Sequence, residues 1–173
     1  NDILIPVFKH AFQLTQTQSQ FVSLSFYVAY TVGSVLYLLI SKLIKEDVTK
    51  RIGYKNSLVT GLCISAFGTL LFYPAANMAS FNLMLSGLFI VGLGFSLLQT
   101  TANPLAISLG TSNTASQRLT LAGGVNNFGT TIGPLIVAFA IFGTPSGNNE
   151  MSIESVKIPY LVLGAAFLIV AVF

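Results

Sequence analysis

The chain has 173 residues, of which 53% are hydrophobic and only 8% are charged, and its formal net charge is +3. A soluble domain usually carries about a quarter charged residues. Its mean hydropathy is +0.79, and the 62 residues between Lys55 and Arg118 contain no charged side chain. About 20 apolar residues cross the hydrocarbon core of a bilayer, so this stretch is long enough for two crossings and a turn. The composition excludes an ordinary soluble domain and predicts an integral membrane protein.

Apolar segments follow one another along the whole chain and predict an all-α polytopic bundle in a single transmembrane domain. The segments at the two ends are short for a crossing, so we expect a fragment of a longer protein whose first and last helices are truncated. The expected spans are 1–13 (partial), 21–41, 57–73, 81–109, 119–142 and 158–173 (partial).

The basic residues predict the orientation of these spans. Six of the eight Lys and Arg residues occur in the two loops that follow the spans 21–41 and 81–109, and only Lys9 and Lys157 fall on the other side. Short loops rich in Lys and Arg face the cytoplasm. We therefore expect a multi-pass protein of the cytoplasmic membrane, and no nucleic-acid partner, because orientation accounts for the basic cluster.

Two patterns of small and polar residues favour close contacts between helices. Glycines allow helices to approach closely in lipid, and we expect this of Gly92, Gly94, Gly123, Gly124 and the pair Gly129 and Gly133. In the span 21–41 a polar stripe recurs every three or four residues, which places it on one helix face. The stripe joins helices together or lines a water-filled cavity, and both interpretations stay open. Its members are Ser23, Tyr27, Tyr30, Ser34, Tyr37 and Ser41.

Amide side chains inside the membrane are the main candidates for binding. Gln99 and Asn103, within "LLQTTANPL", lie four residues apart on one helix face, and Pro104 removes a backbone donor beside them. Asn126 and Asn127 fall at a similar depth in the next span. Each amide has two donors and an acceptor, so the four can bind one another between helices. They can equally form a socket for a ligand with several hydroxyl groups.

Asp2 is the only carboxyl group that the sequence places at membrane depth, and such an acid is a functional candidate by default. His10 is the only histidine, and the five acids are scattered. These residues assemble no catalytic set, phosphate loop or metal-ligand cluster, so we expect neither an enzyme nor a metal site.

Four segments resemble the amino-terminal half of the fucose permease family, sugar transporters of the major facilitator superfamily. They are "NDILIPVFKHAF" (1–12), "LLFYPAAN" (70–77), "LLQTTANPL" (97–105) and "RLTLAGGVNNFGTTIGP" (118–134). The resemblance implies a six-helix half that works with a carboxy-terminal half of the same transporter. It places Asp2 in the first helix, facing a central cavity, and matches Asn103 and Asn126 to motif positions. It also implies two departures, since Gln99 replaces a proton-carrying glutamate and Gly123 replaces a sugar-contacting glutamine.

The resemblance implies a secondary active transporter of a monosaccharide of the L-fucose, glucose or galactose class. Sugar would enter by cation symport with alternating access, with H⁺ or Na⁺ as the coupling ion and no other cofactor. Asp2 would couple the cation, while the sugar would bind Gln99, Asn103, Asn126 and Asn127, with Tyr27 and Tyr30 packing against its ring. The alternative is a small membrane scaffold whose polar residues only pack helices.

Overall fold

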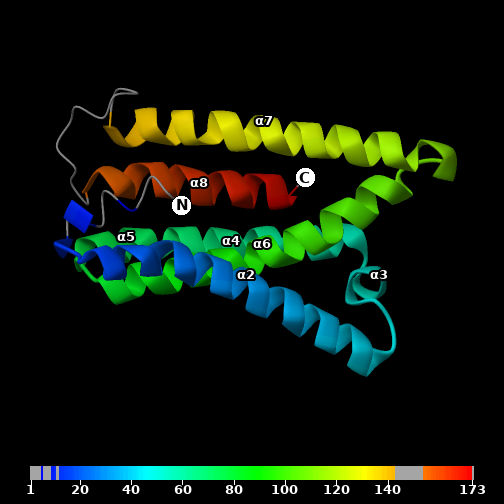
Figure 1. Cartoon of the computed structure of the whole chain (residues 1–173), viewed down its shortest axis with the longest axis horizontal. Coiled ribbons are helices and arrows are strands. Elements are labelled where there is room, and N and C mark those ends of the chain that lie inside the picture. Colours follow the sequence, from blue (N-terminus) through cyan, green and yellow to red (C-terminus); the bar gives the residue numbers. More distant parts are fainter. Residues whose placement is uncertain (1–4, 6–8, 11, 143–153, 173) are drawn as a thin grey trace.

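The computed structural model describes residues 5, 9–10, 12–142 and 154–172, and all regular structure in these residues is helical (Figure 1). The assignment of the chain to the all-α class is therefore confirmed. The elements are α2 (Gln16–Ile44), α3 (Val48–Ile52), α4 (Tyr54–Leu70), α5 (Phe72–Asn77), α6 (Phe81–Ser108), the 3₁₀ turn η1 (Ser112–Thr114), α7 (Ala115–Phe142) and α8 (Glu154–Val172).

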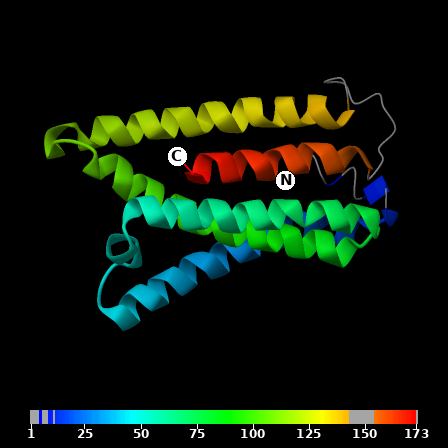
Figure 2. The same cartoon turned by 180° about the vertical axis from the view of Figure 1, so that it is seen from behind.

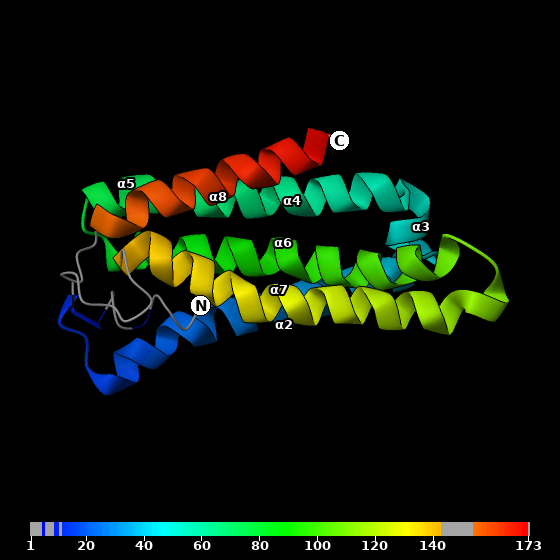
Figure 3. The same cartoon turned by 90° about the horizontal axis from the view of Figure 1, so that it is seen from above.

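The long helices run alongside one another, with α6 between α2 and α4, and α8 against α4 and α5 (Figures 1 and 3). Figure 2 shows the same arrangement from behind, with α7 forming an outer edge beside α8. Three stretches of the described residues are long and apolar enough to cross a membrane: α2, residues 54–77, and α6. The architecture is that of a polytopic membrane bundle.

Local signals fix the ends of α2. Thr15 and Gln18 form a capping box at its start, in which the Thr15 hydroxyl accepts a hydrogen bond from the backbone N–H of Gln18. The helix ends at Ile44, and the residue that caps it, Lys45, has a φ of 58°, in the left-handed region. It therefore begins before and ends after the expected span 21–41, and the basic loop that follows contains the short helix α3.

The two later spans differ from their expected ranges in a similar way. The segment expected at 57–73 consists of α4 and α5, which adjoin at Leu71. Helix α6 continues through Pro104 and ends at Ser108. Its last turns lean away from α4 toward α7 (Figures 1 and 2).

Glycines bring α4 and α6 into backbone contact at two levels. A Cβ atom on Gly94 would lie 2.6 Å from the carbonyl oxygen of Gly61, and one on Gly87 would lie 2.9 Å from that of Gly68. In each helix the two glycines are seven residues apart, so they fall on one face of each antiparallel partner. Because lipid supplies no hydrophobic force between helices, this close packing is what holds α4 against α6.

The expected packing role is therefore right for the glycines of α6. Gly92 meets α2, where an added Cβ would lie 2.6 Å from the carbonyl oxygen of Phe26. It is wrong for α7 within the described structure, where nothing lies within 4 Å of a Cβ built on any of its four glycines. The reason is positional, because α7 is the outermost helix of the bundle (Figures 1 and 2). These four are Gly123, Gly124, Gly129 and Gly133.

Candidate functional site

The amides of α6 occupy an exposed face of that helix. Gln99 and Asn103 are both exposed, whereas Thr101 between them is fully buried, with its hydroxyl donating to the Leu97 carbonyl oxygen at 2.8 Å. Neither amide has a hydrogen-bond partner among the described residues. One side of this turn is thus buried inside the bundle, and the other presents unpaired amide groups.

The amides of α7 are arranged in the same way. Asn126 and Asn127 are exposed, and in the described part of the chain their side chains have no hydrogen-bond partner. Their neighbours Val125 and Phe128 are 66% and 68% exposed. The four amides of α6 and α7 therefore do not bind one another as interhelical glue, and all remain available to a ligand or to another part of the protein.

Arg118 ties the start of α7 to the end of α6. Its guanidinium donates to the carbonyl oxygens of Ala106 (2.9 Å), Ile107 (2.6 Å) and Thr111 (3.0 Å), and also to the Thr114 hydroxyl. The last carbonyls of a helix have no partner within it, and a cation at that end also interacts favourably with the helix dipole. Arg118 therefore fixes how the two amide-bearing helices are joined.

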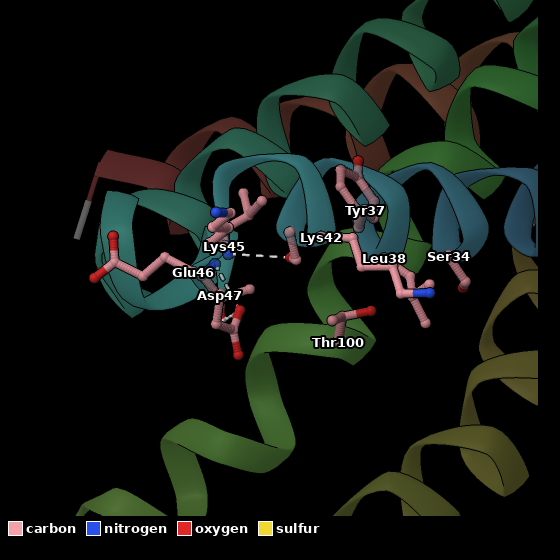
Figure 4. A pocket seen from close by; sticks show the side chains of 11 residues that line it. Ser34, Tyr37, Leu38, Lys42, Lys45, Glu46, Asp47 and Thr100 are labelled. Atoms are coloured by element: carbon pink, nitrogen blue, oxygen red, sulfur yellow. Dashed lines mark hydrogen bonds between the residues drawn. The ribbon is translucent and has the colours of Figure 1, made fainter.

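A groove of about 810 Å³ follows the half of the polar stripe on α2 that lies nearer the basic loop (Figure 4). Three stripe residues, Ser34, Tyr37 and Ser41, line it together with Thr100, the residue that follows Gln99 on α6. At its outer end it is lined by Lys42, Lys45, Glu46 and Asp47. The groove thus extends from the residue beside Gln99 to the basic loop.

Two residues of the polar stripe join helices together, as the first interpretation expects. The Ser34 hydroxyl lies 3.1 Å from the hydroxyl of Ser96 on α6, which joins the two helices. Ser41 accepts a hydrogen bond from the Val48 backbone N–H and so holds α3 against α2. Tyr27 is 58% exposed and Tyr30 is half-buried, so both rings present surface outside the bundle's interior.

The cation-coupling candidate Asp2 lies outside the described residues. His10 is exposed, and the described residues contain no group of three or more His, Cys, Asp or Glu side chains arranged to hold a metal ion. The candidate site therefore consists of neutral amides, hydroxyls and aromatic rings. Such groups bind a neutral polyhydroxylated ligand through hydrogen bonds.

Sequence reasoning missed two contributors to this region. Thr100 lines the groove next to Gln99, and Arg118 acts as a helix clamp in addition to marking the orientation. Thr100 had no distinguishing sequence signal. Arg118 did, because it is the only charged residue between Lys55 and Glu150.

Comparison with known proteins places this architecture in a family. The profile of the Major Facilitator Superfamily matches residues 2–173. The chain belongs to the major facilitator superfamily. A glucose/galactose transporter of Brucella abortus is 38% identical over 173 residues, which cover 99% of this chain and 40% of the relative. The L-fucose-proton symporter of Escherichia coli is 34% identical over 187 residues, covering 99% of this chain and 41% of the symporter.

The solved structures agree with this assignment. A crystal structure of FucP, a major facilitator transporter, in the outward conformation matches with a TM-score of 0.77 and 31% sequence identity. The match covers 99% of this chain and 44% of FucP. The chain thus spans about two fifths of the length of the curated relatives that it matches, and it has the fold of the amino-terminal part of a major facilitator.

Proposed function

We propose that the chain is part of a secondary active transporter that carries a monosaccharide across the cytoplasmic membrane by cation symport. The observation that carries this proposal is the set of exposed, unpaired amides on two adjacent helices, Gln99 and Asn103 on α6 and Asn126 and Asn127 on α7. A sugar hydroxyl both donates and accepts hydrogen bonds, and a primary amide supplies both complements. Relatives named as glucose/galactose and L-fucose transporters support a neutral monosaccharide as the solute.

The mechanism we propose is alternating access, with the remaining part of the transporter closing over the amide face. Major facilitators are built from two halves that rock about a site near the bilayer midplane. Arg118 would keep α6 and α7 moving as one body, because its hydrogen bonds join them at the cytoplasmic turn. Tyr27 and Tyr30 of α2 would pack against the C–H face of the sugar ring.

The side chains available restrict which residue could couple transport to a cation. Gln99 has no titratable proton, so it cannot carry the coupling proton, and Asp2 is the acid that we assign to this role. A carboxylate can take up either H⁺ or Na⁺, and both coupling ions fit the chain. The rival proposal, a non-transporting scaffold, requires the amides to be packed between helices. The exposure of all four argues against it.

The test is uptake of labelled sugars by the full-length protein in cells or proteoliposomes. L-fucose, glucose and galactose are compared in sodium-containing and sodium-free buffers at two pH values. We expect concentrative uptake of at least one sugar that depends on a proton or a sodium gradient. Absence of uptake of all three sugars under every condition would refute the proposal.

A further inference from the structure

A second cavity, of about 420 Å³, lies beside the first at the basic-loop end of α2 and shares Tyr37 and Val48 with it. Its walls come from four helices: α2, α3, α4 and α6. Apart from Tyr37, the deeper walls are formed by aliphatic side chains and two small hydroxyl residues, and Arg51 is the only charged residue that lines it. The lining residues are Tyr37, Ile40, Ile44, Val48, Arg51, Ile52, Ser57, Thr60, Ile64 and Leu97.

The cavity lies at the end of the bundle that carries the basic loop, which we expect to face the cytoplasm. Ile44 ends α2, and Ser57 lies in the first turn of α4, while α3 passes over the opening between them. From Ile44 the cavity extends along α2 to Tyr37, seven residues deeper, which corresponds to about 10 Å at 1.5 Å per residue. The cavity thus begins at the ends of the membrane spans and continues into the apolar layer.

The lining of the cavity is charged at one end and apolar farther along, which matches the polar headgroup and apolar chains of a phospholipid. The exposed guanidinium of Arg51 lies at the α3 end, and the isoleucines Ile40 and Ile64 lie farther along the spans. Residues 42–55 hold five basic and two acidic residues, so this loop carries a net charge of +3. Arginine binds a phosphate through two parallel hydrogen bonds, and basic pockets between helices on the cytoplasmic side bind anionic lipid headgroups.

We infer that this cavity is a binding site for one anionic phospholipid of the cytoplasmic leaflet. Arg51 binds the headgroup phosphate, and one acyl chain lies against the isoleucines between α2 and α4. A polypeptide helix is a poorer occupant, because it would have to place an anionic group at one end and apolar side chains only along the depth. The site is separate from the amide face, so this inference does not rest on sugar transport.

The chain offers a matched control for the headgroup contact. Lys45 belongs to the same basic loop and lies at the same end of the bundle, but it lines the other groove (Figure 4). Arg51→Gln and Lys45→Gln therefore remove one positive charge each from the same membrane face. Only the first removes it from the proposed lipid site. Thr60→Phe tests the acyl-chain contact. Thr60 is exposed and lines the cavity, so the phenyl ring introduced there would fill the cavity without changing its charge.

The experiment uses the purified, delipidated full-length protein with added phosphatidylglycerol or phosphatidylcholine. Binding is measured by native mass spectrometry and by the shift in melting temperature. We expect the wild type and Lys45→Gln to prefer phosphatidylglycerol, and Arg51→Gln to bind it about fivefold more weakly, the equivalent of the roughly 1 kcal/mol that one basic residue contributes near an anionic surface. Thr60→Phe should lose bound lipid of both kinds.

Glycerol phosphate serves as a headgroup without acyl chains, and it should produce no shift. Equal binding of the two lipids to the wild type would overturn the inference, as would an unchanged preference in Arg51→Gln. Failure of both lipids to bind the wild type would do so as well, and would indicate that another part of the protein occupies the cavity. A shift produced by glycerol phosphate alone would contradict the acyl-chain contact.

Discussion

Replacing Gly94 by Ala tests whether glycine contacts hold α4 against α6. The new Cβ would lie 2.6 Å from the Gly61 carbonyl oxygen and 2.8 Å from the Ser65 backbone nitrogen. These are backbone atoms, so a side-chain rotation cannot relieve the clash and the two helices must separate. Overpacking of this kind costs about 1–3 kcal/mol, and the better helix propensity of Ala regains up to about 1 kcal/mol. The two effects leave a net loss of up to about 3 kcal/mol, with about 1–2 kcal/mol in the middle of that range.

The assay is the melting temperature of the purified full-length protein in detergent, followed by the loss of the monodisperse peak on size exclusion. The same substitution at Gly129 of α7 is the comparison, because nothing in the described structure lies within 4 Å of a Cβ at that position. Gly94→Ala should melt at a lower temperature than the wild type, and Gly129→Ala should not. Equal melting of the wild type and Gly94→Ala would refute the packing argument.

Three further predictions concern single side chains. Arg118→Ala leaves the carbonyl oxygens at the end of α6 without their donor. Because a hydrogen bond to a charged group contributes about 1.5–3 kcal/mol, the substitution should lower the melting temperature. An unchanged melting temperature would contradict the role of Arg118 in joining α6 to α7. Ser65→Ala removes a buried hydroxyl that has no partner among the described residues. It should therefore leave the melting temperature unchanged or raise it. A clear drop in the melting temperature would show that the hydroxyl is hydrogen-bonded. Asp2→Asn should still bind sugar but no longer concentrate it in an uptake assay, and retained accumulation would exclude Asp2 from coupling.

The approximate positions of the spans could be predicted because they depend on composition alone, whereas the orientation stays a prediction. The long uncharged interval after Lys55 and the basic loop that precedes it are readable without any contact. The structure places the basic residues of this loop and Arg118 at one end of the bundle (Figure 1). The short helix α3 was not predicted, because five residues are too few for a periodic pattern.

Contacts between helices were harder to predict, since they depend on which faces meet. Gly61 and Gly68 are no more conspicuous in the sequence than Gly129 and Gly133, yet only the first pair touches another backbone within the described residues. The register of each helix and the identity of its neighbours decide this difference, and the spacing of the glycines in the sequence predicts neither. For the same reason, the sequence could not decide whether the amides bind each other. Their exposure at Gln99 and Asn126 decides against that arrangement.

The most direct test of the proposed function is equilibrium binding of a labelled substrate sugar to the purified full-length protein. Asn82 provides the control, because it is also an exposed amide on α6 but lies near the opposite end of that helix. We predict that Gln99→Ala and Asn126→Ala weaken binding about tenfold, since each amide supplies one or two hydrogen bonds of ~0.5–1.5 kcal/mol, and that Asn82→Ala binds as the wild type does. Unchanged affinity in both Gln99→Ala and Asn126→Ala would contradict the account.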